Sequence, residues 1–210
     1  MFNVDYDAFA ANLAPTDDLE LHDGYPAMFH QLMAHDELRQ AFLSRFADHL
    51  NTVFRPEHAR QVLADVAARI AGEIPTHQRR WGRLVSVERW HEDLERLDGF
   101  MAARPQIQRE QLLAAFDLHG TFDLEVVTDP EQGSVKVNSV EVVQATPGVS
   151  DPGRWVGTYL TDVPVTLTAR PAPGHTFERW EGVPPHLAND SQIEVHLDAD
   201  TTVEAVFTPH

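Results

Sequence analysis

The hydrophobic periodicity of this chain changes near Gly120, and no other feature of the sequence constrains the fold as strongly. Before this glycine the apolar residues recur every three or four positions, as in helices, whereas after it they alternate with polar residues, as in half-buried strands. The pattern predicts an α+β chain of two domains, with a helical segment over 1–119 and a small all-β domain over 120–210.

Helix-capping residues and first-turn prolines predict four helices in the first domain, because aspartate and serine cap helices well and proline suits the first turn. The expected starts are Asp36, Pro56, Ser86 and Pro105. The second helix carries aliphatic residues at helical spacing. We expect this stripe to be buried: Val62, Leu63, Val66 and Ile70.

Short alternating runs separated by turn residues predict the strands of the second domain. They are expected around 122–126, 135–137, 164–169, 193–197 and 203–207. The stretch 145–158 is rich in Gly, Pro and Ser, and it is predicted to form an exposed loop. Two aromatic residues, Trp155 and Tyr159, are expected to pack over the sheet, and an exposed aromatic contact is the alternative.

The composition excludes several classes of protein. The net charge is −17, from 33 acidic and 16 basic residues, and Lys136 is the single lysine, so the surface repels phosphate backbones and nucleic-acid binding is not expected. No apolar run reaches the roughly 20 residues that span a bilayer, so no membrane span is expected. The first ten residues show no signal-peptide pattern, and the absence of cysteine excludes disulfides and thiolate metal sites.

Two carboxylates close to the start of the chain form the sharpest acidic feature. Asp5 and Asp7 are two positions apart, and on an extended segment they point to the same side, at a spacing that lets them share a hard cation such as Mg²⁺. The alternative is a solvated chain end. The twelve histidines show no metal-ligand spacing, and no serine-nucleophile or glycine-rich phosphate motif is present.

A cationic run next to an aromatic residue is the other candidate for ligand binding. Arg79 and Arg80 precede Trp81, and paired arginines can hold a phosphate. The alternative, which we favour, is that Trp81 packs against the protein and the arginines offset neighbouring carboxylates.

Several of these segments, in this order, resemble the C-terminal part of the CotH family, atypical protein kinases first known from spore coats. The resemblance covers roughly 1–118. Its carriers are Phe2–Phe9, the helix from Met33 to Phe46, His77–Trp81, Trp90 and Phe100–Pro105.

The resemblance implies ATP-dependent phosphoryl transfer to protein hydroxyls, with Mg²⁺ and ATP as cofactors and a protein as substrate. It also implies that Asp7 holds Mg²⁺ and that Asp5 is a second ligand or a supporting carboxylate, while no catalytic residue is assigned. A CotH kinase needs an upstream lobe and a lysine for ATP, and the only lysine here, Lys136, lies in the β-domain. We therefore expect an N-terminally truncated kinase that is inactive alone and binds no demonstrable cofactor.

The second domain resembles bacterial repeat domains related to the internalin B-repeats, over roughly 120–208. The carriers are Gly133–Asn138, Val163–Pro171, Gly174–Phe177, Trp180–Gly182 and Asp200–Phe207. This resemblance implies a secreted or cell-surface location and leaves an alternative function, a non-catalytic spacer or adhesion module with a surface partner. Because the helical part would lack its usual lobe, we expect its exposed apolar surface to make it the less stable half or to drive self-association. We also expect it to unfold separately from the β-domain.

Overall fold

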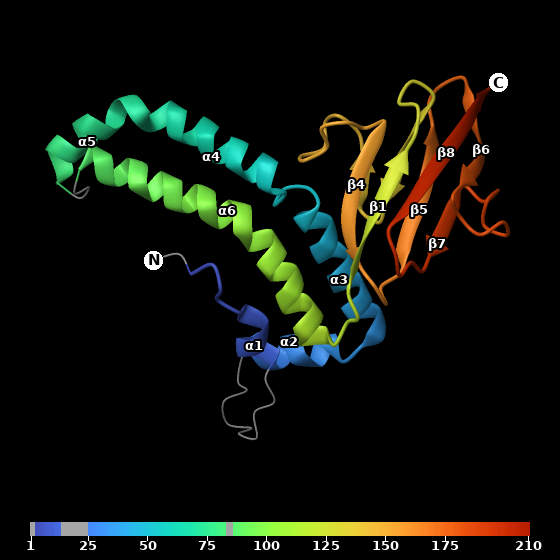
Figure 1. The fold of residues 1–210 in the computed structure, drawn as a ribbon, viewed down its shortest axis with the longest axis horizontal. Helices are drawn as coiled ribbons and strands as arrows, with labels where there is room; N and C mark the ends of the chain where they lie inside the picture. Colours follow the sequence, from blue (N-terminus) through green and yellow to red (C-terminus); the bar gives the residue numbers. More distant parts are fainter. Residues whose placement is uncertain (1–2, 14–24, 83–85) are drawn as a thin grey trace.

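The computed structural model describes residues 3–13, 25–82 and 86–210, and it shows a helical region followed by a β-sandwich (Figure 1). The helix-to-strand change near Gly120 is confirmed, because the last helix ends at Phe116 and the first strand begins at Thr121. The helices are α1 (Ala8–Leu13), α2 (Tyr25–Met33), α3 (Asp36–Leu50), α4 (Pro56–Ile70), a 3-10 turn (Ala71–Glu73), α5 (Ile74–Trp81) and α6 (Val87–Phe116).

In the part of the chain that the structure describes, eight strands form two four-stranded sheets that share one hydrophobic core. The first sheet has the order β4-β1-β8-β6, in which only β1 and β8 are parallel, and the second has the order β3-β2-β5-β7 and is antiparallel throughout. The strands are β1 (Thr121–Val127), β2 (Gly133–Val137), β3 (Val140–Val142), β4 (Arg154–Leu160), β5 (Val165–Pro171), β6 (His175–Glu181), β7 (Gln192–Val195) and β8 (Thr201–Pro209).

The predicted exposed loop at 145–158 is wrong in its last part. Arg154–Leu160 is strand β4, which pairs with β1 over its whole length. Trp155 and Tyr159 on this strand are each only 2% exposed, so both aromatic side chains pack inside the sandwich as expected. The Gly and Pro residues before β4 are typical of a loop, but the apolar residues that follow them fill the core.

The prediction of two separate helices on either side of Pro105 is also wrong. Ser86 caps α6 as predicted, since its Oγ accepts a hydrogen bond from the Arg89 amide at 3.0 Å, but the helix then runs on through Pro105. A proline within a helix removes one backbone hydrogen bond and commonly bends the helix. Figure 1 shows this change of direction, which turns the C-terminal half of α6 toward α1.

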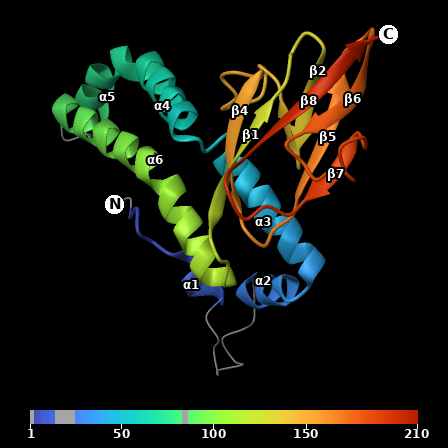
Figure 2. The same cartoon turned by 45° about the vertical axis from the view of Figure 1, so that its right-hand side comes forward.

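Helices α4, α5 and the N-terminal half of α6 project from the body as a helical arm (Figures 1 and 2). Across the arm, Arg60 of α4 makes a bidentate ion pair with Asp98 of α6, at 2.7 and 2.8 Å. None of the α4 side chains is buried, so the prediction of a buried α4 stripe is wrong. The tertiary packing explains this exposure, because α6 covers only one side of α4.

Helix α3 joins the two parts of the chain. Leu43 and Leu112, on α3 and α6, form one buried cluster with Leu160 and Val163, which lie at the end of β4 and before β5. On the neighbouring turn of α3, Asp48 is 2% exposed and accepts hydrogen bonds from the sandwich. The helical region and the sandwich therefore share a continuous interface.

Candidate active-site segment and neighbouring pocket

The two aspartates singled out by the sequence lie on a turn and a helix start instead of an extended strand. Asp5 is exposed within the turn that precedes α1. Asp7 is half-buried, and its Oδ1 accepts hydrogen bonds from the amides of Phe9 and Ala10, both at 2.9 Å. Asp7 thus caps α1, which occupies one of its carboxylate oxygens.

Helix α6 fixes the backbone of this segment in place. The Arg104 guanidinium donates a hydrogen bond to the carbonyl of Val4, and the Gln111 amide donates to the carbonyls of Asp5 and Tyr6, each at 3.3 Å. Phe9 follows and packs into the aromatic cluster of α3 and α6, with its ring 5.6 Å from that of Phe46. The contacts from α6 use backbone carbonyls, so they leave the carboxylate of Asp5 exposed.

The carboxylate oxygens of Asp5 and Asp7 are suitable as some, but not all, of the ligands of a magnesium ion. Mg²⁺ in proteins usually takes one or two carboxylates and completes its octahedron with water and phosphate oxygens. Asp5 offers a whole exposed carboxylate, and Asp7 offers the oxygen that does not cap α1. Within 3–13, 25–82 and 86–210, no group of three or more His, Cys, Asp or Glu residues gathers to hold a metal. A metal here would need ligands beyond this pair.

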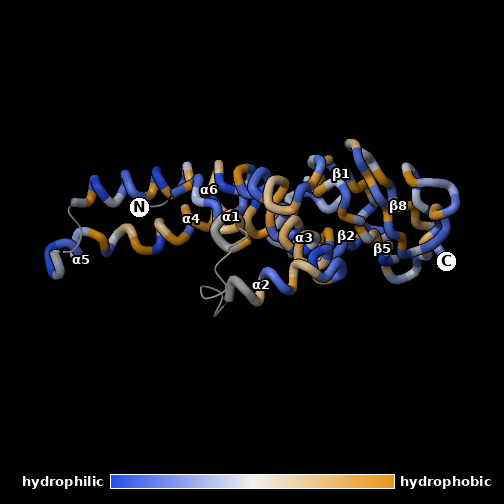
Figure 3. Tube along the Cα trace, turned by 90° about the horizontal axis from the view of Figure 1, so that it is seen from below, coloured by the Kyte–Doolittle hydropathy of each residue, from blue (hydrophilic) through white to orange (hydrophobic). Residues whose placement is uncertain are grey.

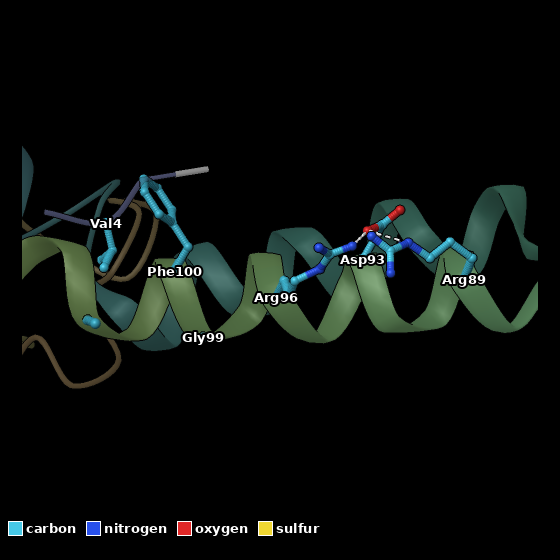
Figure 4. A pocket seen from close by; sticks show the side chains of 7 residues that line it. Val4, Arg89, Asp93, Arg96, Gly99 and Phe100 are labelled. Carbon is cyan, nitrogen blue, oxygen red and sulfur yellow. Dashed lines mark ion pairs between the residues drawn. The ribbon is translucent and has the colours of Figure 1, made fainter. Parts of the chain in front are cut away.

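A pocket of about 710 Å³ lies directly beside this segment, along α6 (Figure 4). Val4 and Phe100 form one end, and the small residues Gly99 and Ala103 form part of the apolar lining, so space is left above the helix. Since Val4 precedes Asp5, the apolar end of the pocket lies next to the candidate metal ligands.

The other end of this pocket is charged but internally paired. Figure 4 shows Asp93 between Arg89 and Arg96, and it forms ion pairs with both. Arg89 also donates a hydrogen bond to Glu92 at 3.1 Å. These residues were not predicted from the sequence to have a role, although their spacing of three and four positions on one helix is a detectable signal.

Each part of the chain is similar to a known protein family. Residues 5–108 match the family model described as CotH kinase protein, and residues 138–210 match the divergent InlB B-repeat domain. The helical part is thus similar to CotH kinases and the sandwich to B-repeat domains, and we call these parts the CotH region and the B-repeat domain. The match to CotH kinases begins at Asp5, and it covers Asp7, the arm and the pocket residues on α6. No curated protein and no solved structure gives a significant match.

The single lysine of the chain does not lie near Asp5 and Asp7. Lys136 is on β2 of the sandwich, and its Nζ is 3.9 Å from the Glu141 carboxylate of the neighbouring strand. Figure 2 shows β2 within the sandwich, while the N-terminal segment lies beside α6. The described part of the CotH region therefore contains arginines but no lysine that could hold a phosphate at Asp5 and Asp7.

The cationic run at the tip of the arm is exposed. Trp81 is 59% exposed, so the prediction that it packs against the protein is wrong. The Arg80 guanidinium lies 5.1 Å from the centre of the Trp81 ring, a distance typical of a cation–π contact. Arg80 and Trp81 lie at the end of α5, on the tip of the arm, so they lie away from Asp5 and Asp7.

Proposed function

We propose that the CotH region contributes metal-binding carboxylates and a substrate-facing pocket to ATP-dependent phosphoryl transfer, and that the B-repeat domain displays it at the bacterial surface. The observation that carries the proposal is the anchoring of the Asp5 segment. Gln111 binds the Asp5 carbonyl at 3.3 Å, while the Asp5 carboxylate stays exposed beside a pocket of about 710 Å³. The acceptor would be a protein hydroxyl, as the resemblance to CotH kinases implies.

In this proposal Asp7 and Asp5 hold Mg²⁺ in part, and phosphate oxygens and water complete its shell. The ion would neutralise charge on the transferring phosphoryl group. The described chain supplies no lysine near these carboxylates, so we expect no phosphoryl transfer by this chain alone. No described helix is long and apolar enough to cross a membrane.

Paramagnetic broadening in NMR spectra tests the proposed metal site, because it detects a metal ion even when it binds weakly. Mn²⁺, which replaces Mg²⁺ at oxygen sites, should broaden the amide signals of Asp5 to Phe9 before those of other acidic segments, and excess Mg²⁺ should reverse the effect. Asp7→Asn is well suited to this test, because asparagine still caps α1 while it removes the charge. The matched control is Asp198→Asn, which changes an exposed carboxylate on the sandwich.

The experiment has two informative outcomes. Loss of the local broadening in Asp7→Asn, but not in Asp198→Asn, supports the metal site. Uniform broadening over the whole acidic surface contradicts it and favours the second candidate, a non-catalytic surface module. One observation favours that module: the buried contacts of α3 with the sandwich build the CotH region and the B-repeat domain into one continuous body.

A further inference from the structure

Another pocket, of about 650 Å³, lies at the base of the arm, where α4 and α6 meet α3. Helix α3 contributes Phe46 and Leu50, α4 contributes Val62, and α6 contributes Met101 and Pro105. We call the pocket lined by these residues the base pocket. Figure 3 shows hydrophobic stretches along α4 and around the base of the arm. A concave and mostly apolar site of this size, between helices, is typical of the places where proteins bind small molecules.

The base pocket is closed on one side and open to solvent on the other. Leu50 and Pro105 are buried, so the wall that they form belongs to the packed part of the molecule. Phe54, on the link between α3 and α4, and Val62 are 57% and 46% exposed at the open side. An apolar ligand between these walls would remove the exposed side chains from water, which favours its binding.

The ionisable side chains that line the base pocket are both basic. They are His58 of α4 and Arg104 of α6, and no carboxylate is among the described lining residues, although the chain carries 33 acidic residues. An apolar pocket with basic groups complements a ligand that combines an apolar body with a negative charge. The charge of the lining therefore indicates an amphipathic anion.

Arg104 has hydrogen-bond donors left for such an anion. Its guanidinium donates a hydrogen bond to the carbonyl of Val4, and it forms no ion pair with any residue in the described part of the chain. Arginine carries five N–H donors in a fork that matches the two oxygens of a carboxylate. Arg104 can therefore bind a carboxylate in the base pocket while it keeps its contact with Val4.

We propose that the base pocket binds an aliphatic carboxylate, of the class of the fatty acids. The tail lies between the apolar side chains of α3, α4 and α6, with Phe54 and Met101 among its contacts. The carboxylate lies at Arg104. This activity is separate from metal binding by Asp5 and Asp7, because neither aspartate lines the base pocket.

The same lining argues against other occupants. A leucine or phenylalanine side chain of another protein would fill the apolar part, but it would leave the remaining donors of Arg104 without a partner. An anionic membrane surface is disfavoured, because it repels a chain with a net charge of −17. A single carboxylate is small enough to interact mainly with the groups next to it, since salt screens the more distant charges.

NMR of the methionine methyl groups tests occupancy in the full chain. Among the described methionines, Met101 lines the base pocket, whereas Met28 and Met33 lie on α2 and serve as internal controls. Titration with decanoate should shift the Met101 methyl signal and leave the other two in place. An unchanged Met101 signal overturns the proposal, and so does an equal shift of all three signals. A Met101 signal that moves with protein concentration alone would show that a second copy fills the pocket, which also overturns it.

Chain length and head group test the two parts of the ligand. Affinity should rise about fourfold for each methylene from hexanoate to decanoate, as expected for a buried aliphatic tail. Decanol has the same tail without the charge, and it should bind at least fivefold more weakly than decanoate. Arg104→Gln should abolish this preference, whereas Gln111→Ala, which also removes contacts to the Asp5 segment but lies outside the base pocket, should retain it. Equal affinities of decanol and decanoate for the wild type overturn the proposal.

Filling the pocket tests the location of the ligand. Ala59 of α4 lines the base pocket, so Ala59→Trp should lower the affinity for decanoate at least tenfold. The matched control is Ala64→Trp, which changes an exposed residue of the same helix outside the pocket and should bind as the wild type does. Circular dichroism of both variants separates lost binding from lost folding. Wild-type affinity in a folded Ala59→Trp variant overturns the proposed site.

Discussion

The hydroxyl of Tyr159 on β4 donates a hydrogen bond to Asp48 on α3 at 3.2 Å, and both residues are 2% exposed. Asp48 also accepts a hydrogen bond from the amide of Ser139 at 3.0 Å, and the Ser139 hydroxyl contacts the same carboxylate at 2.5 Å. A carboxylate on a helix thus binds donors from both sheets of the sandwich. The contact ties the CotH region to the B-repeat domain.

Asp48 should make the stability of the protein depend on pH. Burial raises the pKa of Asp48 above its ordinary value of 3.8, although hydrogen bonds from Ser139, Asn138 and Tyr159 offset part of this effect. The folded protein therefore binds the proton more tightly than the unfolded chain does. The cost of burying the charge is fully present above the folded-state pKa, and it disappears as the pH falls below the unfolded-state pKa.

Urea unfolding at several pH values, compared with Asp48→Asn, measures this dependence. As the pH falls from 7 toward 4, the wild-type free energy of unfolding should rise relative to that of Asp48→Asn, which is neutral throughout. Asp198→Asn is the control for an exposed carboxylate and should follow the wild type. Parallel curves for the wild type and Asp48→Asn would show that the buried charge carries no such cost.

The shared core leads us to expect that both parts of the chain unfold together, in contrast to the separate unfolding expected from the sequence. Leu43 of α3 is 1% exposed and packs with Leu160 and Val163 of the sandwich. Leu43→Ala should destabilise the protein by about 2–4 kcal/mol, through lost burial and a cavity. Hydrogen exchange should then accelerate to a similar degree in peptides of α6 and of β5. Acceleration confined to the helices would mean that the sandwich folds independently.

Asn51 should stabilise the interface between α3 and the sandwich. Its amide donates a hydrogen bond to the carbonyl of Thr158 at 2.8 Å and accepts one from the Thr158 amide at 3.0 Å, while Arg109 donates to it at 2.9 Å. Asn51→Ala leaves these groups unpaired at a buried position, so we expect a loss of about 2–3 kcal/mol. Asn189→Ala, on an exposed loop, should change stability by less than about 0.5 kcal/mol. Equal effects in chemical denaturation would contradict the role of Asn51.

Alanine substitutions at two glycines with positive φ distinguish the stability cost of backbone strain from that of a steric clash. Gly174 (φ 84°) has open space around its missing Cβ, whereas a Cβ at Gly182 (φ 81°) would lie 2.1 Å from the Thr202 carbonyl oxygen. Gly174→Ala should therefore cost about 1 kcal/mol, from the left-handed backbone alone. Gly182→Ala should cost at least about 2 kcal/mol more, because β8 must move. Thermal unfolding of the two variants provides the comparison, and similar melting temperatures would refute the clash.

Local sequence patterns predicted only part of the candidate site. Asp5 and Asp7 stand out in the sequence by their spacing, and the structure places them on a segment that α6 anchors. The arrangement around them was not predictable, because Arg104 and Gln111 are about a hundred residues away in the chain. Only the fold of α6 brings these side chains to the Asp5 segment.

By itself, the sequence determined the features that depend on neighbours along the chain. These are the change of periodicity near Gly120, the alternation of the core strands and the cap at Ser86. Tertiary structure decided the features that depend on distant partners. Val66 has a helical pattern typical of a buried face, yet it stays exposed because α6 covers another side of α4. Amphipathic spacing specifies which residues share a face, but only the packing of the whole chain decides whether that face finds a partner.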